Sequence, residues 1–154
     1  MLHDPLAVYY LDTDTLVLNP SPAQARRVGW RYLVNSGGSV DAVEVLGDQV
    51  TSITQGEVPS HLAQAMSVAE HTVDKLNDYE ARILLFGRAG HALLWLHTTS
   101  PGQDRFFSLG ANPKEVAKDD AMRRASEKAR MRQRLSTAVH DVQTPSAEPD
   151  ESGG

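Results

Sequence analysis

The chain has 154 residues, of which 40% are hydrophobic and 23% are charged, as is typical of one globular domain with a substantial core. It contains no cysteine, which excludes disulfides and cysteine-ligated zinc or iron–sulfur sites and favours a cytoplasmic location. The opening MLHDPLAVYY has no basic region followed by a long apolar core, and no apolar run reaches the roughly 18 residues of a membrane span. We therefore expect neither a secretory signal nor a membrane partner.

The net charge of −5 is unevenly distributed along the chain. Residues 1–113 carry 7 Lys/Arg against 12 Asp/Glu, residues 114–139 carry 8 against 4, and residues 140–154 carry 0 against 4. This pattern predicts three parts: an α+β globular domain at 1–111, a charged C-terminal helix at 112–140 and a disordered acidic tail at 141–154.

The first third of the chain predicts a hairpin, a helix and two further strands. The apolar runs LAVYYL and TLVLN flank the segment 12–14, Asp-Thr-Asp, which favours a β-hairpin. In SPAQARRVGWRYLVN, the residues Ser21, Pro22 and Gln24 fit a helix N-terminus, so we expect a helix from there to Asn35. VDAVEVLGDQVTSIT is typical of two short strands about a Gly-Asp turn.

The clearest predicted helix is SHLAQAMSVAEHTVDKL, within residues 60–76. Its apolar residues alternate steps of four and three, which places them on one buried stripe: Leu62, Met66, Ala69, Val73 and Leu76.

The next segment, YEARILLFGRAGHALLWLHTT, predicts two strands joined by a glycine-containing turn. Leu84 and Phe86 point to the face opposite Ile83, and both faces of the second strand are also apolar. Such strands need a cover on each side. The helix at 61–76 supplies one cover, and the other is either a further helix or a second copy of the protein. RFFSLG gives a last strand.

The predicted order is therefore ββαββαβββα. Consecutive strands on short turns favour an α+β fold, a two-layer sandwich with a mainly antiparallel sheet, followed by a long C-terminal helix and a disordered tail.

That C-terminal helix is expected to begin at Asn112 and Pro113, a capping residue and a proline at the first helical position. Asp119 and Asp120 each precede an arginine by four residues, so helix ion pairs explain part of its charge without any ligand. Its small and apolar strips are weak, and a helix of this kind often packs against another chain.

Nucleic acid is the alternative partner for this helix. Its candidate contacts are Arg123, Arg124, Lys128, Arg130, Arg132 and Arg134. On a helical wheel they form two columns, roughly 140° apart, so one flat row of phosphates meets only half of them. No aromatic residue follows Phe107, so this segment offers no ring on which a base can stack.

One short stretch, YYLDTDTLV, is similar to the opening of haloacid-dehalogenase-type phosphatases, in which an apolar strand precedes an Asp-x-Asp motif. The resemblance implies that Asp12 is the nucleophile and Asp14 the general acid/base. It covers about nine residues and departs at Leu16, where the family prefers Thr or Val. Asp48 mimics the metal-binding acid, but no second acid follows it closely. The other interpretation is a hairpin turn with two solvated aspartates.

The remaining polar residues predict no catalytic, metal or cofactor site. His91 and His97 lie on one strand face but roughly 20 Å apart, too far to share a metal ion. We therefore interpret the chain as a small, self-associating, non-enzymatic protein-interaction or regulatory module. Nucleic-acid binding is the alternative, and phosphatase-like chemistry is a weaker one. The predicted partner-binding residues are Leu84, Phe86, Leu94, Leu96, Met131 and Leu135.

Overall fold

The structure is a computed structural model that describes residues 5–55, 57–87, 91–100 and 102–143. Its elements, in chain order, are β1 (Leu6–Leu11), α1 (Thr13–Leu18), the short 3₁₀ helix η1 (Pro22–Gln24), β2 (Arg26–Ser36), β3 (Ser39–Leu46), β4 (Gln49–Gln55), α2 (Glu57–Thr72), the 3₁₀ helix η2 (Leu76–Asp78), β5 (Glu80–Phe86), β6 (His91–His97), β7 (Arg105–Ser108), β8 (Glu115–Val116) and α3 (Lys118–Gln143).

All eight described strands form a single sheet in the order β4-β3-β2-β1-β5-β6-β7-β8. Neighbouring strands are antiparallel except β1 and β5, which run parallel and join two antiparallel meanders. The long connection that a parallel pair requires contains β2–β4 and α2. The predicted α+β class, the mainly antiparallel sheet and the long C-terminal helix are therefore confirmed.

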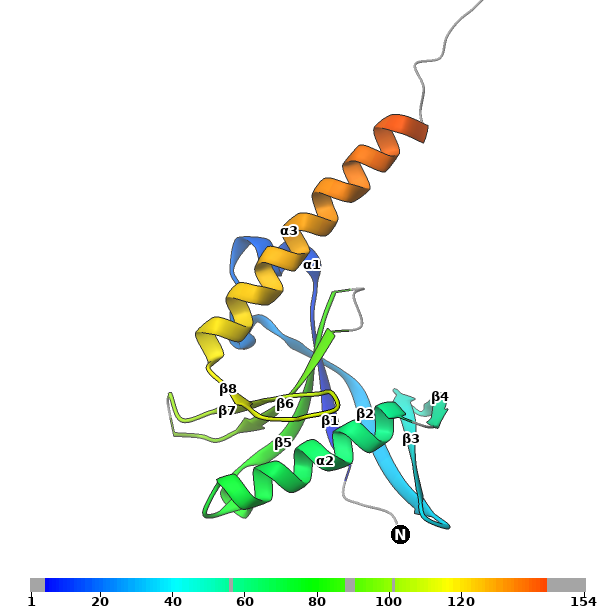
Figure 1. The fold of residues 1–154 in the computed structure, drawn as a ribbon, viewed down its shortest axis with the longest axis vertical. Coiled ribbons are helices and arrows are strands. Elements are labelled where there is room, and N and C mark those ends of the chain that lie inside the picture. Colours follow the sequence, from blue (N-terminus) through cyan, green and yellow to red (C-terminus); the bar gives the residue numbers. More distant parts are fainter. Residues whose placement is uncertain (1–4, 56, 88–90, 101, 144–154) are drawn as a thin grey trace, which may run out of the picture.

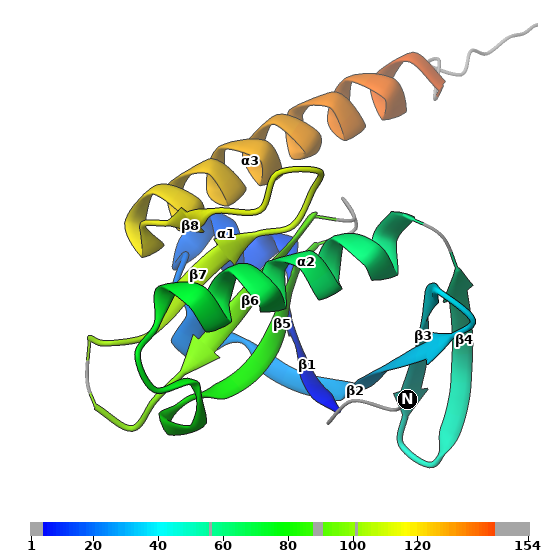
Figure 2. The ribbon, with the colours of Figure 1, turned by 60° about the horizontal axis from the view of Figure 1, so that its bottom comes forward.

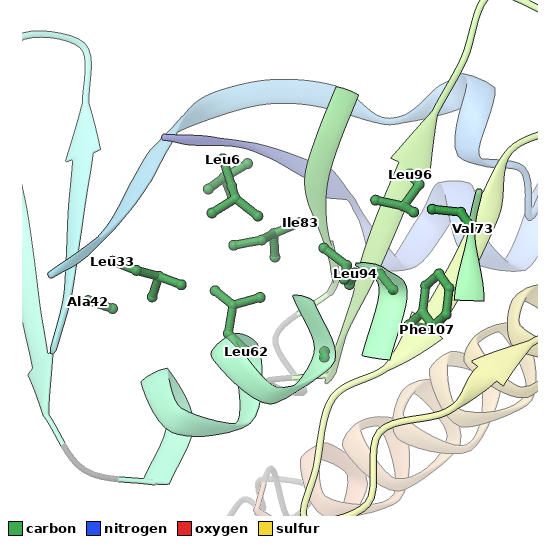
Figure 3. Packing of buried hydrophobic residues seen from close by; sticks show 12 residues of the cluster. Leu6, Leu33, Ala42, Leu62, Val73, Ile83, Leu94, Leu96 and Phe107 are labelled. Atoms are coloured by element: carbon green, nitrogen blue, oxygen red, sulfur yellow. The ribbon is translucent and has the colours of Figure 1, made fainter. Parts of the chain in front are cut away.

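Helices cover both faces of the sheet, so the fold has three layers where the sequence predicted two (Figures 1 and 2). On one face α2 buries Leu62, Ala65 and Ala69 against a cluster that contains Ile83 and Leu94 (Figure 3). On the other face α1 and α3 cover a second cluster. Its buried members are Leu11, Leu16, Leu84, Phe86, Leu93, Trp95, Phe106, Met122, Ala125 and Ala129.

The physical reason for the third layer is the alternation of β5 and β6. Successive side chains of a strand point to opposite faces, and both faces of this hairpin are apolar. The prediction that each face needs a cover is confirmed, and the chain's own helices provide both covers.

Two predicted elements are wrong, so the order ββαββαβββα is corrected. TLVLN is expected as a strand, but residues 13–18 form α1, because the Asp12 side chain accepts a hydrogen bond from Thr15 N–H and caps the helix. The helix expected at 21–35 is the strand β2. Ser21 does cap a helix there, but only the three-residue η1.

The later elements agree better with the sequence. The predicted helix within 60–76 is α2, displaced toward the N-terminus, and the hairpin at 79–97 is β5–β6. The C-terminal helix begins at Lys118 rather than at residue 113, because Glu115 and Val116 first pair with β7 as the short strand β8. The predicted disordered tail lies outside the described residues, apart from residues 141–143, which continue α3.

Candidate functional site

Helix α3 holds the charges that the sequence singled out, and the sheet fixes its orientation. Met122, Ala125 and Ala129 are buried over the face that carries Leu84 and Phe86. The C-terminal part of the helix extends beyond the rest of the protein (Figure 1). Because the buried stripe faces the sheet, the basic side chains emerge along the two flanks of the helix.

The first flank faces α1, and Arg130 and Arg123 on this flank have partners in α1 or in α3 itself. Arg130 donates to the Val17 carbonyl oxygen at 3.4 Å, and Gln133 donates to Asp14 at 3.1 Å. Arg123 forms ion pairs with Asp120 and Glu127, both at 3.4 Å. Arg134 is exposed on the same flank. The charge of Arg123 is thus largely neutralised on the helix itself.

The second flank faces the start of β6. Arg124, Lys128 and Arg132 follow one another at intervals of four residues, which places them in a row about 12 Å long. All three are exposed. Within the described part of the chain, no carboxylate lies within ion-pair distance of any of them.

His91, the first residue of β6, meets this row. The Lys128 Nζ atom lies 2.9 Å from His91 Nε2. An ammonium group can only donate, so Nε2 accepts and the imidazole is neutral in this arrangement. Burial, and secondly the charge of Lys128, lower the pKa of His91 below 6.5.

Two hollows border the row and share His91 and Lys128. The smaller, about 20 Å³, is also lined by Thr13, Gly87 and Arg132, and it has room for about one water molecule. The larger, about 440 Å³, is also lined by Lys114 and Arg124. We call this surface the cationic groove and define it by Lys114, Arg124, Lys128, Arg132 and His91.

Four of the predicted partner-binding residues are not accessible. Leu84 and Phe86 are buried under α1 and α3, and Leu94 and Leu96 are buried on the face that α2 covers. They form the core of the chain rather than a docking surface. The other two, Met131 and Leu135, are 62% and 60% exposed on the projecting part of α3.

A second exposed apolar surface lies at the far edge of the sheet. Among the described strands β4 pairs only with β3, and its Val50 and Ile53 are 60% and 66% exposed. A bulge between β3 and β4 places Val50 opposite Val45 and Ile53 opposite Val43, so both exposed residues share one face. We call Gln49–Gln55 the β4 edge.

The two aspartates of the phosphatase-like motif, Asp12 and Asp14, accept hydrogen bonds from residues of α1 and α3. Asp12 accepts from Thr15 N–H at 2.8 Å, and this hydrogen bond lowers the pKa of Asp12. Asp14 accepts from Gln133. Asp48 lies in the turn between β3 and β4, which β2 separates from β1. Among the described residues, no group of three or more His, Asp or Glu side chains could hold a metal ion.

One further polar cluster was missed in the sequence. Asp104 accepts from Trp95 Nε1 at 2.8 Å, from His97 Nδ1 at 2.9 Å and from Thr98 N–H at 2.9 Å. The Arg82 guanidinium beside it lies 4.4 Å from the centre of the Tyr9 ring and 4.7 Å from the centre of the Trp95 ring. The carboxylate ties β6 to the segment before β7.

Lys114 and His91 of the groove were also missed as site residues. His91 and Lys128 are 37 positions apart, and nothing local in the sequence signals their contact.

In the part of the chain that the structure describes, no helix is both long enough and apolar enough to cross a membrane. No protein-family model, no curated protein and no solved structure matches this chain.

Proposed function

We propose that this protein is a small, non-enzymatic interaction module that self-associates, and that the β4 edge is the contact surface. The observation that carries the proposal is the contrast between the two edges of the sheet. At one edge β8 has two residues, whereas at the other β4 has seven.

An open edge strand presents a row of unpaired backbone N–H and C=O groups to any extended chain. Proteins commonly protect such edges with charges, proline, bulges or very short strands. The edge at β8 is protected because β8 has only two residues. The sequence of β4, QVTSITQ, contains no charge and no proline, and the bulge leaves Ser52–Gln55 in regular pairing with β3. This combination supports strand addition at the β4 edge.

A second copy suits this edge because β4 is self-complementary. Its exposed Val50 and Ile53 are β-branched, the residue type that pairs well across strands. An antiparallel pair of β4 strands puts no like charges opposite each other, and a two-fold axis gives both copies the same contacts. Pairing also places the exposed Val50 and Ile53 of each copy beside the other copy.

The experiment measures the mass of the full chain by size-exclusion chromatography with light scattering over a range of concentrations. We expect a concentration-dependent dimer. Ile53→Lys should give a monomer, because it places like charges between the two paired β4 strands. The matched Ile53→Thr variant should still dimerise. Residue 53 is largely exposed, so both variants should fold.

Two results contradict the proposal. One is a wild-type chain that stays monomeric at all concentrations. The other is a dimer that survives Ile53→Lys but is lost in a Met131→Gln, Leu135→Gln double variant, which would assign self-association to α3.

The cytoplasmic location that we propose rests on the absence of cysteine from the sequence.

A further inference from the structure

We propose that the cationic groove binds the phosphate backbone of double-stranded nucleic acid, independently of base sequence. This binding site is distinct from the proposed self-association surface, since the groove lies over β6–β8 and α3 while β4 is the opposite edge of the sheet. Although the chain carries a net charge of −5, Lys114, Arg124, Lys128 and Arg132 gather on this surface.

The groove is selectively positive, because the carboxylates that line it are already paired. Glu115 accepts two hydrogen bonds from Arg105, and this contact lowers the pKa of Glu115. Asp120 pairs with Arg123. Both of these arginines lie outside the groove, so Arg124, Lys128 and Arg132 remain available to an external anion.

The shape of the groove favours an extended polyanion over a small phosphate compound. The cations do not converge on one hollow: Arg132 lines the hollow of about 20 Å³, and Lys114 and Arg124 line the one of about 440 Å³. Together Arg124, Lys128 and Arg132 form an exposed row about 12 Å long. A row of this kind matches successive charges along a nucleic-acid backbone.

The lining also favours a duplex over a single strand. Binding of unpaired bases relies on rings that are free to stack. Phe86, which lines both hollows, is buried, and the exposed His91 ring is held by Lys128 at its Nε2 atom. Backbone contacts alone position a protein on a duplex without reading its sequence. The helical wheel predicts that one row of phosphates contacts only one of the two columns of basic residues on α3. We infer that this column is Arg124, Lys128 and Arg132.

His91 couples the binding of nucleic acid to the uptake of a proton. Its contact with Lys128 requires a neutral ring, and the charged side chains around it are Lys114, Glu115, Asp120, Arg124, Lys128 and Arg132. With both carboxylates paired, a bound phosphate is the nearest group that can stabilise a protonated imidazole. Nucleic acid should therefore promote proton uptake by His91, and by linkage acidification should tighten binding.

The test uses the full chain and fluorescence anisotropy of a labelled duplex DNA, with a duplex RNA and a single-stranded DNA as further probes. The double variant Lys128→Gln, Arg132→Gln is compared with Arg130→Gln, Arg134→Gln, which removes the same charge from the other flank. We expect the groove variant to bind the duplex at least about tenfold more weakly than the wild type. The slope of log K against log salt should fall in magnitude by about 2, because each lost phosphate contact removes roughly 0.9. The control should lose much less.

Three outcomes overturn the site: no duplex binding by the wild-type chain, equal weakening in both double variants, or a preference for the single strand. Equal binding of DNA and RNA duplexes agrees with recognition of the backbone. Because Ile53→Lys leaves the groove intact, it should still bind the duplex, so a failure of the self-association proposal and a failure of this one are distinguishable.

The proton link has its own readout. Wild-type affinity should rise several-fold more between pH 7.5 and pH 5.5 than that of His91→Gln, whereas His97→Gln, whose ring pairs with Asp104 outside the groove, should behave as the wild type. An unchanged pH dependence in His91→Gln removes His91 from the site.

Discussion

Trp95 donates the hydrogen of its indole nitrogen to Asp104 Oδ2 at 2.8 Å, and this bond fixes a buried ring of β6 to the segment that leads into β7. The same carboxylate also accepts from His97 and from Thr98 N–H. Asp104→Ala should lower the free energy of unfolding by about 1–3 kcal/mol, because the buried indole N–H loses its acceptor. Urea denaturation at pH 7 measures the loss, and Asp41→Ala serves as a comparison. A change below about 0.5 kcal/mol would contradict this account.

The Asp104 carboxylate should also make the free energy of unfolding depend on pH. Burial raises the pKa of Asp104, but hydrogen bonds from Thr98, His97 and Trp95 outweigh that effect and hold it below 3.8. Its contribution to stability is therefore present above pH 3.8 and lost as the pH falls through the folded-state pKa. The stability difference between wild type and Asp104→Asn should shrink on acidification from pH 5 toward pH 2. Denaturation at several pH values measures it, and a constant difference would argue against an ionised, hydrogen-bonded Asp104.

Arg31 and Glu44 pair across β2 and β3 on the face that α2 covers. The Arg31 side chain is only 13% exposed, its Nε has no hydrogen-bond partner, and burial lowers its pKa. Glu44→Gln should destabilise the protein by roughly 3 kcal/mol, because it leaves a buried charge without a counter-charge. The double variant Arg31→Met, Glu44→Met should recover most of that loss. Thermal unfolding of the wild type, Arg31→Met, Glu44→Met and the double variant measures the coupling, and simple additivity would show that the pair is not coupled.

Gly29 allows β2 and β3 to approach closely. A Cβ atom there would overlap the Val45 carbonyl oxygen and lie 2.6 Å from Leu46 Cδ2. Gly29→Ala should therefore cost about 1–3 kcal/mol. Gly110 provides the control, because its added Cβ meets no atom within 4 Å and Gly110→Ala should change stability by less than about 0.5 kcal/mol. Denaturation midpoints of the two variants test the contrast, and equal values would refute it.

Helix α3 should be held to the sheet only by its N-terminal half. Met122 is buried, whereas Leu135 is 60% exposed. Met122→Ala should cost about 2–5 kcal/mol, and Leu135→Ala less than about 0.5 kcal/mol in the monomer. Hydrogen exchange gives an independent measurement: amides around residue 125 should exchange far more slowly than those around residue 137. Equal protection along the helix would mean that a partner covers its projecting part.

The amphipathic patterns were the most reliable guide to the fold. The doubly apolar β5–β6 hairpin follows from local spacing alone, and the structure confirms it. The predicted stripe is confirmed for Leu62, Met66 and Ala69 of α2, whereas Val73 and Leu76 also pack on this core but follow the end of the helix. The prediction of a helix at residues 21–35 was wrong because two local signals competed. The capping residues Ser21 and Pro22 favour a helix, whereas the alternation of Val28, Trp30, Tyr32 and Val34 favours a strand, and sheet pairing on both sides decides for the strand.

The candidate sites were less predictable, because they depend on contacts distant in sequence. The helical wheel separates the basic columns of α3, but only the packing of α3 shows which column faces β6 and which faces α1. Burial of Leu84 and Phe86 by the chain's own helices likewise required the three-dimensional arrangement. The exposed β4 edge could not be inferred from its sequence, since edge and interior strands share the same alternation.

The parallel pairing of β1 with β5 also constrains how the chain folds. Strand β1 ends at Leu11, and β5 begins only at Glu80. The hairpins β2–β3 and β3–β4 close over short turns, but the centre of the sheet must await a partner from the other half of the chain, and such non-local pairing slows folding. During synthesis one side of LAVYYL therefore remains without its β5 neighbour until residues 80–86 have been made, so the hydrogen bonds that unite the two meanders cannot form before then.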